Sequence, residues 1–264
     1  MYNFNYHRPS TLADAAKMLQ GASEGKLIAG GMTLIPTLKQ RLAKPSDLID
    51  LAKIPDLKGI KKDGNTVVIG AMTKHAEVAS SDVVKSAIPA LAELASHIGD
   101  PAVRNRGTIG GSIANNDPAA DYPSAVVALN ATVVTNKRKI AADDFFKGMF
   151  ETALQPGEIV TAVQFPIPEK AAYMKFPNPA SRYAIVGVFV AKTGSGVRVG
   201  VTGAGPGVFR QKDMEAALAK SFTPEAVANI KVSASGLNGD IHASPEYRAH
   251  LVTVMAKRAV AAAK

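Results

Sequence analysis

Ala29-Gly30-Gly31-Met32-Thr33-Leu34-Ile35-Pro36 places two adjacent glycines between an apolar run and a threonine, and Thr108-Ile109-Gly110-Gly111-Ser112 combines the same residue types later in the chain. A diphosphate needs several backbone N–H donors that converge on its oxygens, and glycine lets the main chain approach closely and adopt positive φ. Either stretch alone is also typical of a tight turn. Their occurrence together favours a site in which both contact one diphosphate.

The surroundings of the first stretch predict a strand, a tight loop and a helix. The strand covers the apolar residues 27–29 and ends at the glycines, and Thr33 is the expected N-cap of a helix that continues to Pro45. The inward face of this helix is expected to consist of Leu34, Leu38 and Leu42.

Hydrophobic periodicity and turn signals predict the other elements of the first part of the chain. The expected helices cover 11–20, 82–98 and 124–130, with a shorter helix capped by Thr73. The expected strands cover 48–51, 66–69, 132–135 and 159–165. Residues 99–123 are rich in Gly, Asn, Asp, Pro and Ala and are expected to form a loop.

A domain boundary is expected near residue 170, because Pro166 and Pro168 close the preceding strand. Three strands follow, at 173–176, 183–192 and 197–202, and then helices near 213–220, 224–230 and from 245 onward. Strands followed by helices predict an α+β second domain.

Other phosphate-binding motifs are absent. Neither glycine stretch is the G-x-G-x-x-G of the usual dinucleotide fold, and no GxxxxGK[ST] loop is present. Gly203-Ala204-Gly205-Pro206-Gly207 is G-x-G-x-G, and its proline removes a backbone donor, so a turn after a strand is expected there.

Composition excludes several classes of chemistry. The chain has 264 residues and no cysteine, which excludes disulfides, thiolate nucleophiles and cysteine-held zinc or iron–sulfur clusters. Redox chemistry therefore requires a bound cofactor. Because neither a membrane helix nor an apolar signal segment is visible, the chain is expected to be cytoplasmic, without a membrane span.

The charge of +9 is spread over small groups of Lys and Arg rather than one stripe with interleaved aromatics. A solvated surface, a face for an anionic cofactor and an acidic partner all agree with this pattern, whereas nucleic-acid binding is disfavoured. The five histidines show no metal-ligand spacing, so no metal site is expected.

Residues 115–123 carry two carboxylates, Asp117 and Asp121, on a stretch rich in turn residues. Either carboxylate is explained by a turn, and Asp121 by capping the helix that follows. The alternative is that a short acidic side chain on a rigid loop binds sugar hydroxyls or a heterocycle N–H.

Several motifs together resemble the FAD-binding medium subunit of molybdenum hydroxylases, the family of xanthine dehydrogenase, aerobic carbon monoxide dehydrogenase and aldehyde oxidoreductases. These motifs are the two glycine stretches with their flanks, 29–45 and 100–123, then Glu151-Thr152-Ala153-Leu154-Gln155-Pro156-Gly157-Glu158-Ile159, Arg182-Tyr183-Ala184-Ile185-Val186-Gly187 and Tyr247-Arg248. The resemblance spans nearly the whole chain in the expected order.

The resemblance implies an α+β fold of two domains. Residues 1–170 would form an FAD-binding unit of two α/β subdomains, of the vanillyl-alcohol-oxidase (PCMH) type. Residues 171–264 would form a smaller α+β domain of the CO dehydrogenase flavoprotein type, with a three-stranded antiparallel sheet and helices.

The resemblance also implies the residues that bind FAD. The diphosphate and its riboses would contact Leu27, Ile28, Ala29, Gly30, Gly31, Met32, Thr33, Leu34, Thr108, Ile109, Gly110, Gly111 and Ser112. Ile98 would lie near adenine, where some members carry an aromatic residue. Asp121 would lie on the ribityl and flavin side, Val160 and Tyr183 at the ring system, and Lys175 near its pyrimidine edge. Asp117 would also bind the cofactor. Taken without the family, Ile98 and Val160 are equally explained as core residues and Lys175 as an exposed strand lysine.

The implied function is electron transfer in a heterotrimer, with no catalytic acid, base or nucleophile in this chain. A large subunit would hold the molybdopterin cofactor and oxidise the substrate, and a small subunit would hold [2Fe-2S] clusters that pass electrons to FAD. The acceptor would be NAD, oxygen, a quinone or another carrier.

Two alternatives remain open from the sequence. One is a stand-alone FAD-dependent oxidoreductase with its own substrate pocket. The other is a basic nucleic-acid or scaffold protein without a flavin.

Overall fold

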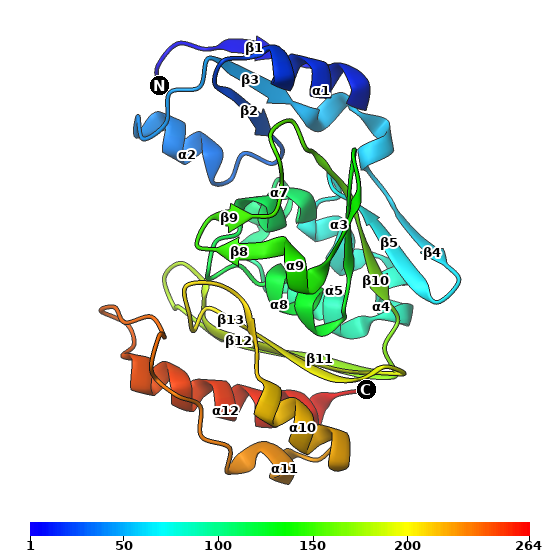
Figure 1. Cartoon of the computed structure of the whole chain (residues 1–264), viewed down its shortest axis with the longest axis vertical. Helices are drawn as coiled ribbons and strands as arrows, with labels where there is room; N and C mark the ends of the chain where they lie inside the picture. Colours follow the sequence, from blue (N-terminus) through cyan, green and yellow to red (C-terminus); the bar gives the residue numbers. More distant parts are fainter.

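The computed structural model describes residues 1–264 and arranges them in three tiers (Figure 1). A small parallel sheet with α1 and α2 lies at one end, an antiparallel sheet with most of the short helices lies in the middle, and a second antiparallel sheet covered by the last helices lies at the other end. No helix has both the length and the apolar character required to cross a bilayer.

The first tier is a three-stranded parallel sheet with the order β1-β3-β2. Its strands are β1 (Asn5–His7), β2 (Gly25–Ile28) and β3 (Asp47–Asp50), connected through α1 (Leu12–Gly21) and α2 (Leu34–Lys39). Thr11 caps α1 as expected, because its side chain accepts a hydrogen bond from the Asp14 backbone N–H at 3.1 Å. Two short 3₁₀ turns, η1 (Leu51–Lys53) and η2 (Pro55–Leu57), lead to the second tier.

The second tier is a five-stranded antiparallel sheet with the order β4-β5-β10-β6-β7. Its strands are β4 (Ile60–Asp63), β5 (Thr66–Gly70), β6 (Thr132–Thr135), β7 (Lys139–Ala141) and β10 (Val160–Pro166). The helices of this tier are α3 (His75–Ser80), α4 (Asp82–Ala87), α5 (Pro89–Ser96), α6 (Pro101–Arg104), α7 (Ile109–Asn115), α8 (Tyr122–Ala128) and α9 (Ala142–Phe145). A hairpin of β8 (Phe146–Gly148) and β9 (Glu151–Thr152) projects from α9.

The third tier contains the three strands expected after residue 170, β11 (Lys170–Pro177), β12 (Ala184–Thr193) and β13 (Gly196–Thr202). A fourth strand that the sequence analysis did not predict, β14 (Phe209–Arg210), pairs with β13 at the sheet edge. The helices α10 (Lys212–Lys220), α11 (Pro224–Ala228) and α12 (Pro245–Ala262) cover one face (Figure 1). The strands-then-helices order confirms the α+β prediction for this part of the chain.

The opposite face of the third-tier sheet packs on the second tier. Tyr173 and Phe189 from this sheet belong to the same buried cluster as Leu91 of α5 and Val126 of α8. Burial of aromatic and aliphatic side chains on both faces explains why β12 is an almost continuous apolar run rather than an alternating one.

Three helix predictions were wrong in detail. The expected helix 82–98 is broken at Ile88, because Pro89 starts α5 and disfavours the helical conformation of the residue before it. The helix after Thr33 ends at Lys39, leaving Leu42 73% exposed, and Thr33 makes no side-chain cap. Thr73 does not cap α3; its hydroxyl exchanges hydrogen bonds with the Gly59 backbone instead.

The expected loop 99–123 contains two short helices and the start of α8, and the residues between them form turns and loops. Asp100 caps α6 by accepting a hydrogen bond from the Val103 N–H at 2.8 Å, and Thr108 caps α7. Both helices are a few residues long, so packing rather than intrinsic propensity stabilises them, which explains why composition did not indicate them.

Candidate functional site

The first glycine stretch forms a loop between β2 and α2 that exposes a run of unused backbone donors. Gly31 adopts a positive φ of 75°. The Ile35 N–H donates to the Gly31 carbonyl at 2.9 Å, but the N–H groups from Gly30 to Leu34 donate to no acceptor within the chain. Successive free N–H groups around a left-handed residue form a concave anion-binding nest.

Gly30 is required by packing against the protein itself. A Cβ at this position would overlap the carbonyl oxygen of Arg106 and lie 2.7 Å from the Gly107 Cα. The first loop therefore rests on the backbone that leads into the second glycine stretch. The two stretches meet in space, as the prediction of a shared site requires.

The second glycine stretch differs from the expected loop, because it is the first turn of α7. Thr108 Oγ1 accepts from the Gly111 N–H at 3.1 Å, while the N–H groups of Ile109 and Gly110 donate to the Thr73 and Ala71 carbonyls at 3.1 and 2.9 Å. These backbone donors are already used. The Thr108 N–H and the Ser112 hydroxyl have no partner within the chain and remain available.

Asp117 forms a turn and Asp121 does not form a cap. Asp117 Oδ1 accepts from the Ala119 N–H at 2.9 Å, which is the turn interpretation left open by the sequence. Asp121 precedes α8 but makes no side-chain capping bond. The helix-cap explanation of Asp121 is therefore wrong.

Asp121 instead joins a buried cluster with two residues of β11. Lys175 Nζ lies 2.9 Å from Asp121 Oδ1 and 3.0 Å from Oδ2, and the Tyr173 hydroxyl donates to Oδ1. The side chains of Lys175 and Asp121 are only 4% and 5% exposed. Burial raises the pKa of Asp121, while the Lys175 ammonium and the two side-chain hydrogen bonds act in the opposite direction. Lys175 is thus not an exposed strand lysine.

Lys175 also connects this cluster to the neighbourhood of Ile98. Its ammonium donates to the carbonyl oxygen of His97 at 3.0 Å. Ile98 is partly buried and packs against the core of the second tier. Lys175 therefore contacts the backbone next to Ile98, the residue expected at adenine.

Tyr183 stands at the end of a preformed turn between β11 and β12. Asn178 Oδ1 accepts from the N–H groups of Ala180 and Ser181 at 2.9 and 3.2 Å, and the Asn178 N–H donates to the Tyr183 carbonyl at 2.8 Å. Burial and the nearby carboxylates of Asp117 and Asp121 raise the pKa of Tyr183, whereas a hydrogen bond with Thr33 lowers it. Tyr183 therefore lies between the first loop and the Asp117–Asp121 segment.

The remaining expected site residues are distributed between strand, loop and core. Leu27 and Ile28 are partly buried at the end of β2, Met32 is 41% exposed on the loop, and Leu34 begins α2. Val160 is buried at the start of β10 within the core cluster. A structural role thus accounts for Val160 without a ligand.

The third-tier sheet holds the segment between Asp117 and Asp121 by its backbone. The Thr202 hydroxyl donates to the carbonyls of Ala120 and Pro118 at 2.6 and 3.1 Å, and the Gly203 N–H donates to the Pro118 carbonyl at 2.8 Å. Gly203 begins the expected turn after β13 and adopts a φ of 81°. Sequence reasoning missed Tyr173 and Thr202, because their partners lie far away along the chain.

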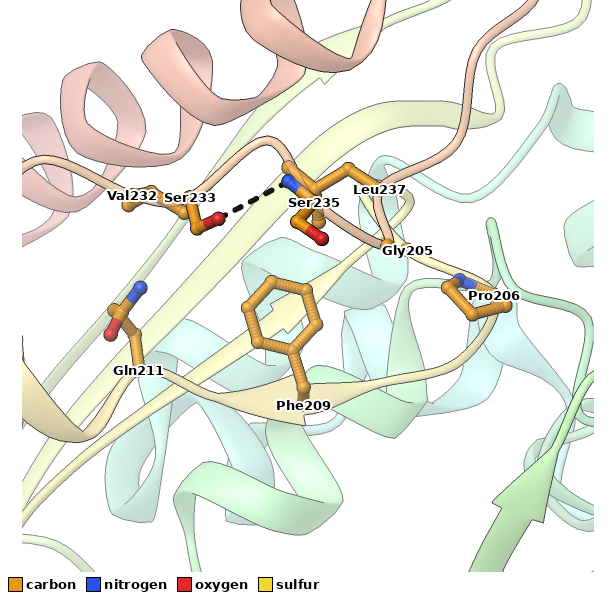
Figure 2. Close-up of a pocket in the computed structure, with 9 residues that line it drawn as sticks. Gly205, Pro206, Phe209, Gln211, Val232, Ser233, Ser235 and Leu237 are labelled. Carbon is orange, nitrogen blue, oxygen red and sulfur yellow. Dashed lines mark hydrogen bonds between the residues drawn. The ribbon is translucent and has the colours of Figure 1, made fainter.

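A separate pocket of about 300 Å³ lies in the third tier and shares no residue with this site (Figure 2). The Phe209 ring faces it, and the Ser233 hydroxyl accepts from the Ser235 N–H at 3.2 Å on the opposite wall. No group of three or more potential metal ligands occurs in the structure.

Comparison with known families divides the chain into two matched regions. Residues 2–168 match the family described as FAD binding domain in molybdopterin dehydrogenase. Residues 171–263 match the CO dehydrogenase flavoprotein C-terminal domain.

Individual relatives match over nearly the whole chain. The carbon monoxide dehydrogenase medium chain of Hydrogenophaga pseudoflava is 37% identical over 98% of this chain and 96% of its own length. The glyceraldehyde dehydrogenase medium chain of Sulfolobus acidocaldarius is 36% identical over 97% and 96%. A solved structure of the Hydrogenophaga pseudoflava carbon monoxide dehydrogenase, which lacks the Mo-pyranopterin moiety of the molybdenum cofactor, superposes with a TM-score of 0.91 at 38% identity and covers 98% of this chain and 96% of its own.

Proposed function

Since the chain belongs to the family of FAD-binding medium subunits of molybdenum hydroxylases, we propose that it carries electrons from the [2Fe-2S] clusters of a small partner subunit to an external acceptor. The clusters would be reduced by a large molybdopterin-binding subunit, where the substrate is oxidised. The acceptor is NAD, oxygen, a quinone or another carrier. This chain contributes the FAD site.

The observation that carries the proposal is the run of free backbone N–H groups from Gly30 to Leu34. The left-handed Gly31 gives this run the concave shape that binds phosphate oxygens. Unused amides cost free energy unless water or a ligand accepts their hydrogen bonds. A diphosphate satisfies several of them at once, so the residues present fit FAD.

Different residues of the candidate site are proposed to contact different parts of FAD. Residues 27–34 would hold the diphosphate, and Thr108 and Ser112 would add an N–H and a hydroxyl from the start and body of α7. Tyr183 would lie against the flavin from the C-terminal side. Ile98 would lie near adenine, and Lys175 would lie near the pyrimidine edge of the flavin with Asp121 beside it.

FAD, when bound, supplies the ability to connect single-electron with two-electron transfer. The chain orients the cofactor, excludes water from one side and sets the electrostatic field around it. No side chain near the site is arranged as a nucleophile with an adjacent base. The expected domains, 1–170 for FAD binding and 171–264 for the C-terminal unit, remain part of this proposal.

A stand-alone FAD-dependent oxidoreductase is the second candidate, because the glycine loop would bind FAD equally well without partners. The two candidates differ in what accompanies the chain. If the chain is a subunit of a heterotrimer, a large molybdenum-containing polypeptide and a small polypeptide with [2Fe-2S] absorbance should co-purify with the tagged chain from its native host. A yellow, catalytically complete single polypeptide would instead support the second candidate.

FAD binding itself is tested by titrating the isolated chain with FAD and following flavin fluorescence and visible absorbance. We expect stoichiometric binding and a yellow complex that survives gel filtration. A folded chain that takes up no FAD under these conditions contradicts the proposed function.

A further inference from the structure

We propose that Tyr173 is a positioning residue for the flavin site: its hydroxyl holds the Asp121 carboxylate in the orientation that pairs with Lys175. This inference rests on the proposed function, because it concerns how Asp121 is oriented towards Lys175 in the site proposed to bind FAD. Tyr173 belongs to none of the motifs that carry the family resemblance.

The geometry places Tyr173 entirely inside the protein. Its side chain is 1% exposed, and its ring stacks on Phe189 with the centroids 6.2 Å apart. The only polar atom of the side chain donates to Asp121 Oδ1, the same oxygen that lies 2.9 Å from Lys175 Nζ. A buried hydroxyl that donates to a carboxylate fixes the direction of that carboxylate.

The neighbouring strand leaves room for this contact. Gly187 lies on β12 opposite Lys175, and a Cβ built on it would overlap the Tyr173 hydroxyl oxygen and lie 2.9 Å from the Thr202 Cγ2. Gly187 has no positive φ, so its glycine is not explained by backbone conformation. The missing side chain is explained by the space that the Tyr173 hydroxyl needs to reach Asp121.

The cluster has a defined charge balance. The Asp121 carboxylate and the Lys175 ammonium are both nearly excluded from water, and their opposite charges compensate each other. The Tyr173 hydroxyl donates a hydrogen bond that further stabilises the negative charge on Asp121. Loss of the hydroxyl leaves more uncompensated negative charge beside the bound flavin. Negative charge disfavours the reduced, anionic form of a flavin, so its midpoint potential should become more negative.

The test compares Tyr173→Phe with Thr253→Val in the 264-residue chain loaded with FAD. Tyr173→Phe removes only the hydroxyl that reaches Asp121, whereas Thr253→Val removes a hydroxyl that donates to the Ile230 carbonyl at 2.9 Å, among the helices of the third tier. We expect Tyr173→Phe to bind FAD about tenfold more weakly and to shift the flavin midpoint potential in the negative direction, because one hydrogen bond to a charged group is lost. Thr253→Val should lower thermal stability and leave the potential unchanged.

Two further variants test the same Tyr173–Asp121–Lys175 contact in other ways. Gly187→Ala should move the Tyr173 hydroxyl away from Asp121 and reproduce the negative shift, and Lys175→Met should produce a larger shift in the same direction. An unchanged potential in both Tyr173→Phe and Gly187→Ala, or an equal shift in Thr253→Val, would overturn the positioning role. A folded wild-type chain that binds no FAD would overturn the proposed function instead, and it is recognised before any variant is compared.

Discussion

Gly111 faces Ala29 across the contact between the two glycine stretches: a Cβ on Gly111 would lie 3.4 Å from the Ala29 Cβ and 3.0 Å from Thr108 Oγ1. Because Gly111 has no side chain, the β2–α2 loop can lie close to α7 at this point. This relationship makes Gly111 the most direct test of a diphosphate site between them.

Gly111→Val should weaken FAD binding by about tenfold or more, because a branched side chain would displace Thr108 and the first loop, which are proposed to supply hydrogen bonds to the diphosphate. The measurement is a fluorescence titration with FAD, with circular dichroism to confirm folding. Gly207→Ala is the matched control, since a Cβ there meets nothing within 4 Å. Equal FAD affinity in the two variants would contradict the assigned site.

Glu158 should make stability depend on acid pH. Hydrogen bonds from the Arg138 guanidinium lower the pKa of this buried carboxyl from 4.5 to about 2, despite the opposing effect of burial. The unfolded chain therefore binds a proton before the folded one does. The stabilisation is complete above pH 4.5 and is lost as the pH falls towards 2, by roughly 3 kcal/mol in total.

Urea unfolding of wild type and Glu158→Gln at a series of pH values measures this effect. The variant should be less stable at pH 7, and the difference should shrink below pH 4.5. Glu225→Gln, at an exposed carboxylate without an ion pair, is the control and should match wild type throughout. A pH-independent difference for Glu158→Gln would show that the ion pair with Arg138 does not set its protonation.

His75 should make stability depend on pH in a different range, between pH 6.5 and 4. Burial, with a smaller contribution from Arg104, lowers its pKa from 6.5 to about 4, and its ring lies against Tyr122 with centroids 5.4 Å apart. The unfolded chain takes up this proton first, so stability falls between pH 6.5 and 4 by roughly 3 kcal/mol. NMR titration should show one imidazole that protonates near pH 4 and disappears in His75→Gln; a His75 signal that titrates near 6.5 would contradict this.

Asn116 should hold the β8–β9 hairpin in place. Its buried side-chain NH₂ donates to the carbonyls of Gly148 and Glu151, both at 2.7 Å, and its backbone carbonyl accepts from the Phe150 N–H at 3.1 Å. Asn116→Ala should cost about 1–3 kcal/mol and accelerate amide exchange across 146–152. Asn115→Ala, at a half-buried neighbour without side-chain hydrogen bonds, should leave exchange unchanged; equal exchange in both variants would exclude the tether.

The sequence predicted the elements whose signals are local. The strands at 132–135 and 197–202 and the start of the first helix at Thr11 follow from alternation and capping, and the structure confirms them. Pro89 carried a helix-breaking signal that the apolar periodicity of 82–98 outweighed in the prediction. The signal at Pro89 was the correct one, because the residue before a proline rarely stays helical.

The candidate site was only partly visible in the sequence. The first glycine stretch was identified by composition, and the structure adds its unused donors. Tyr173, however, looks like any aromatic residue of a buried strand, and its pairing with Asp121 depends on a tertiary contact across more than fifty residues. Sequence patterns report on neighbours along the chain, so contacts of this kind have no local signature.

The segment from Pro118 to Ala120 has no regular structure of its own and is held by Thr202 and Gly203 of the third tier. Cutting the polypeptide near residue 170 would leave these carbonyls without their donors, next to a carboxylate that had lost its counter-ion. Chimaeras that exchange the C-terminal unit between relatives should therefore lose affinity for the nucleotide unless the 118–121 stretch is exchanged as well.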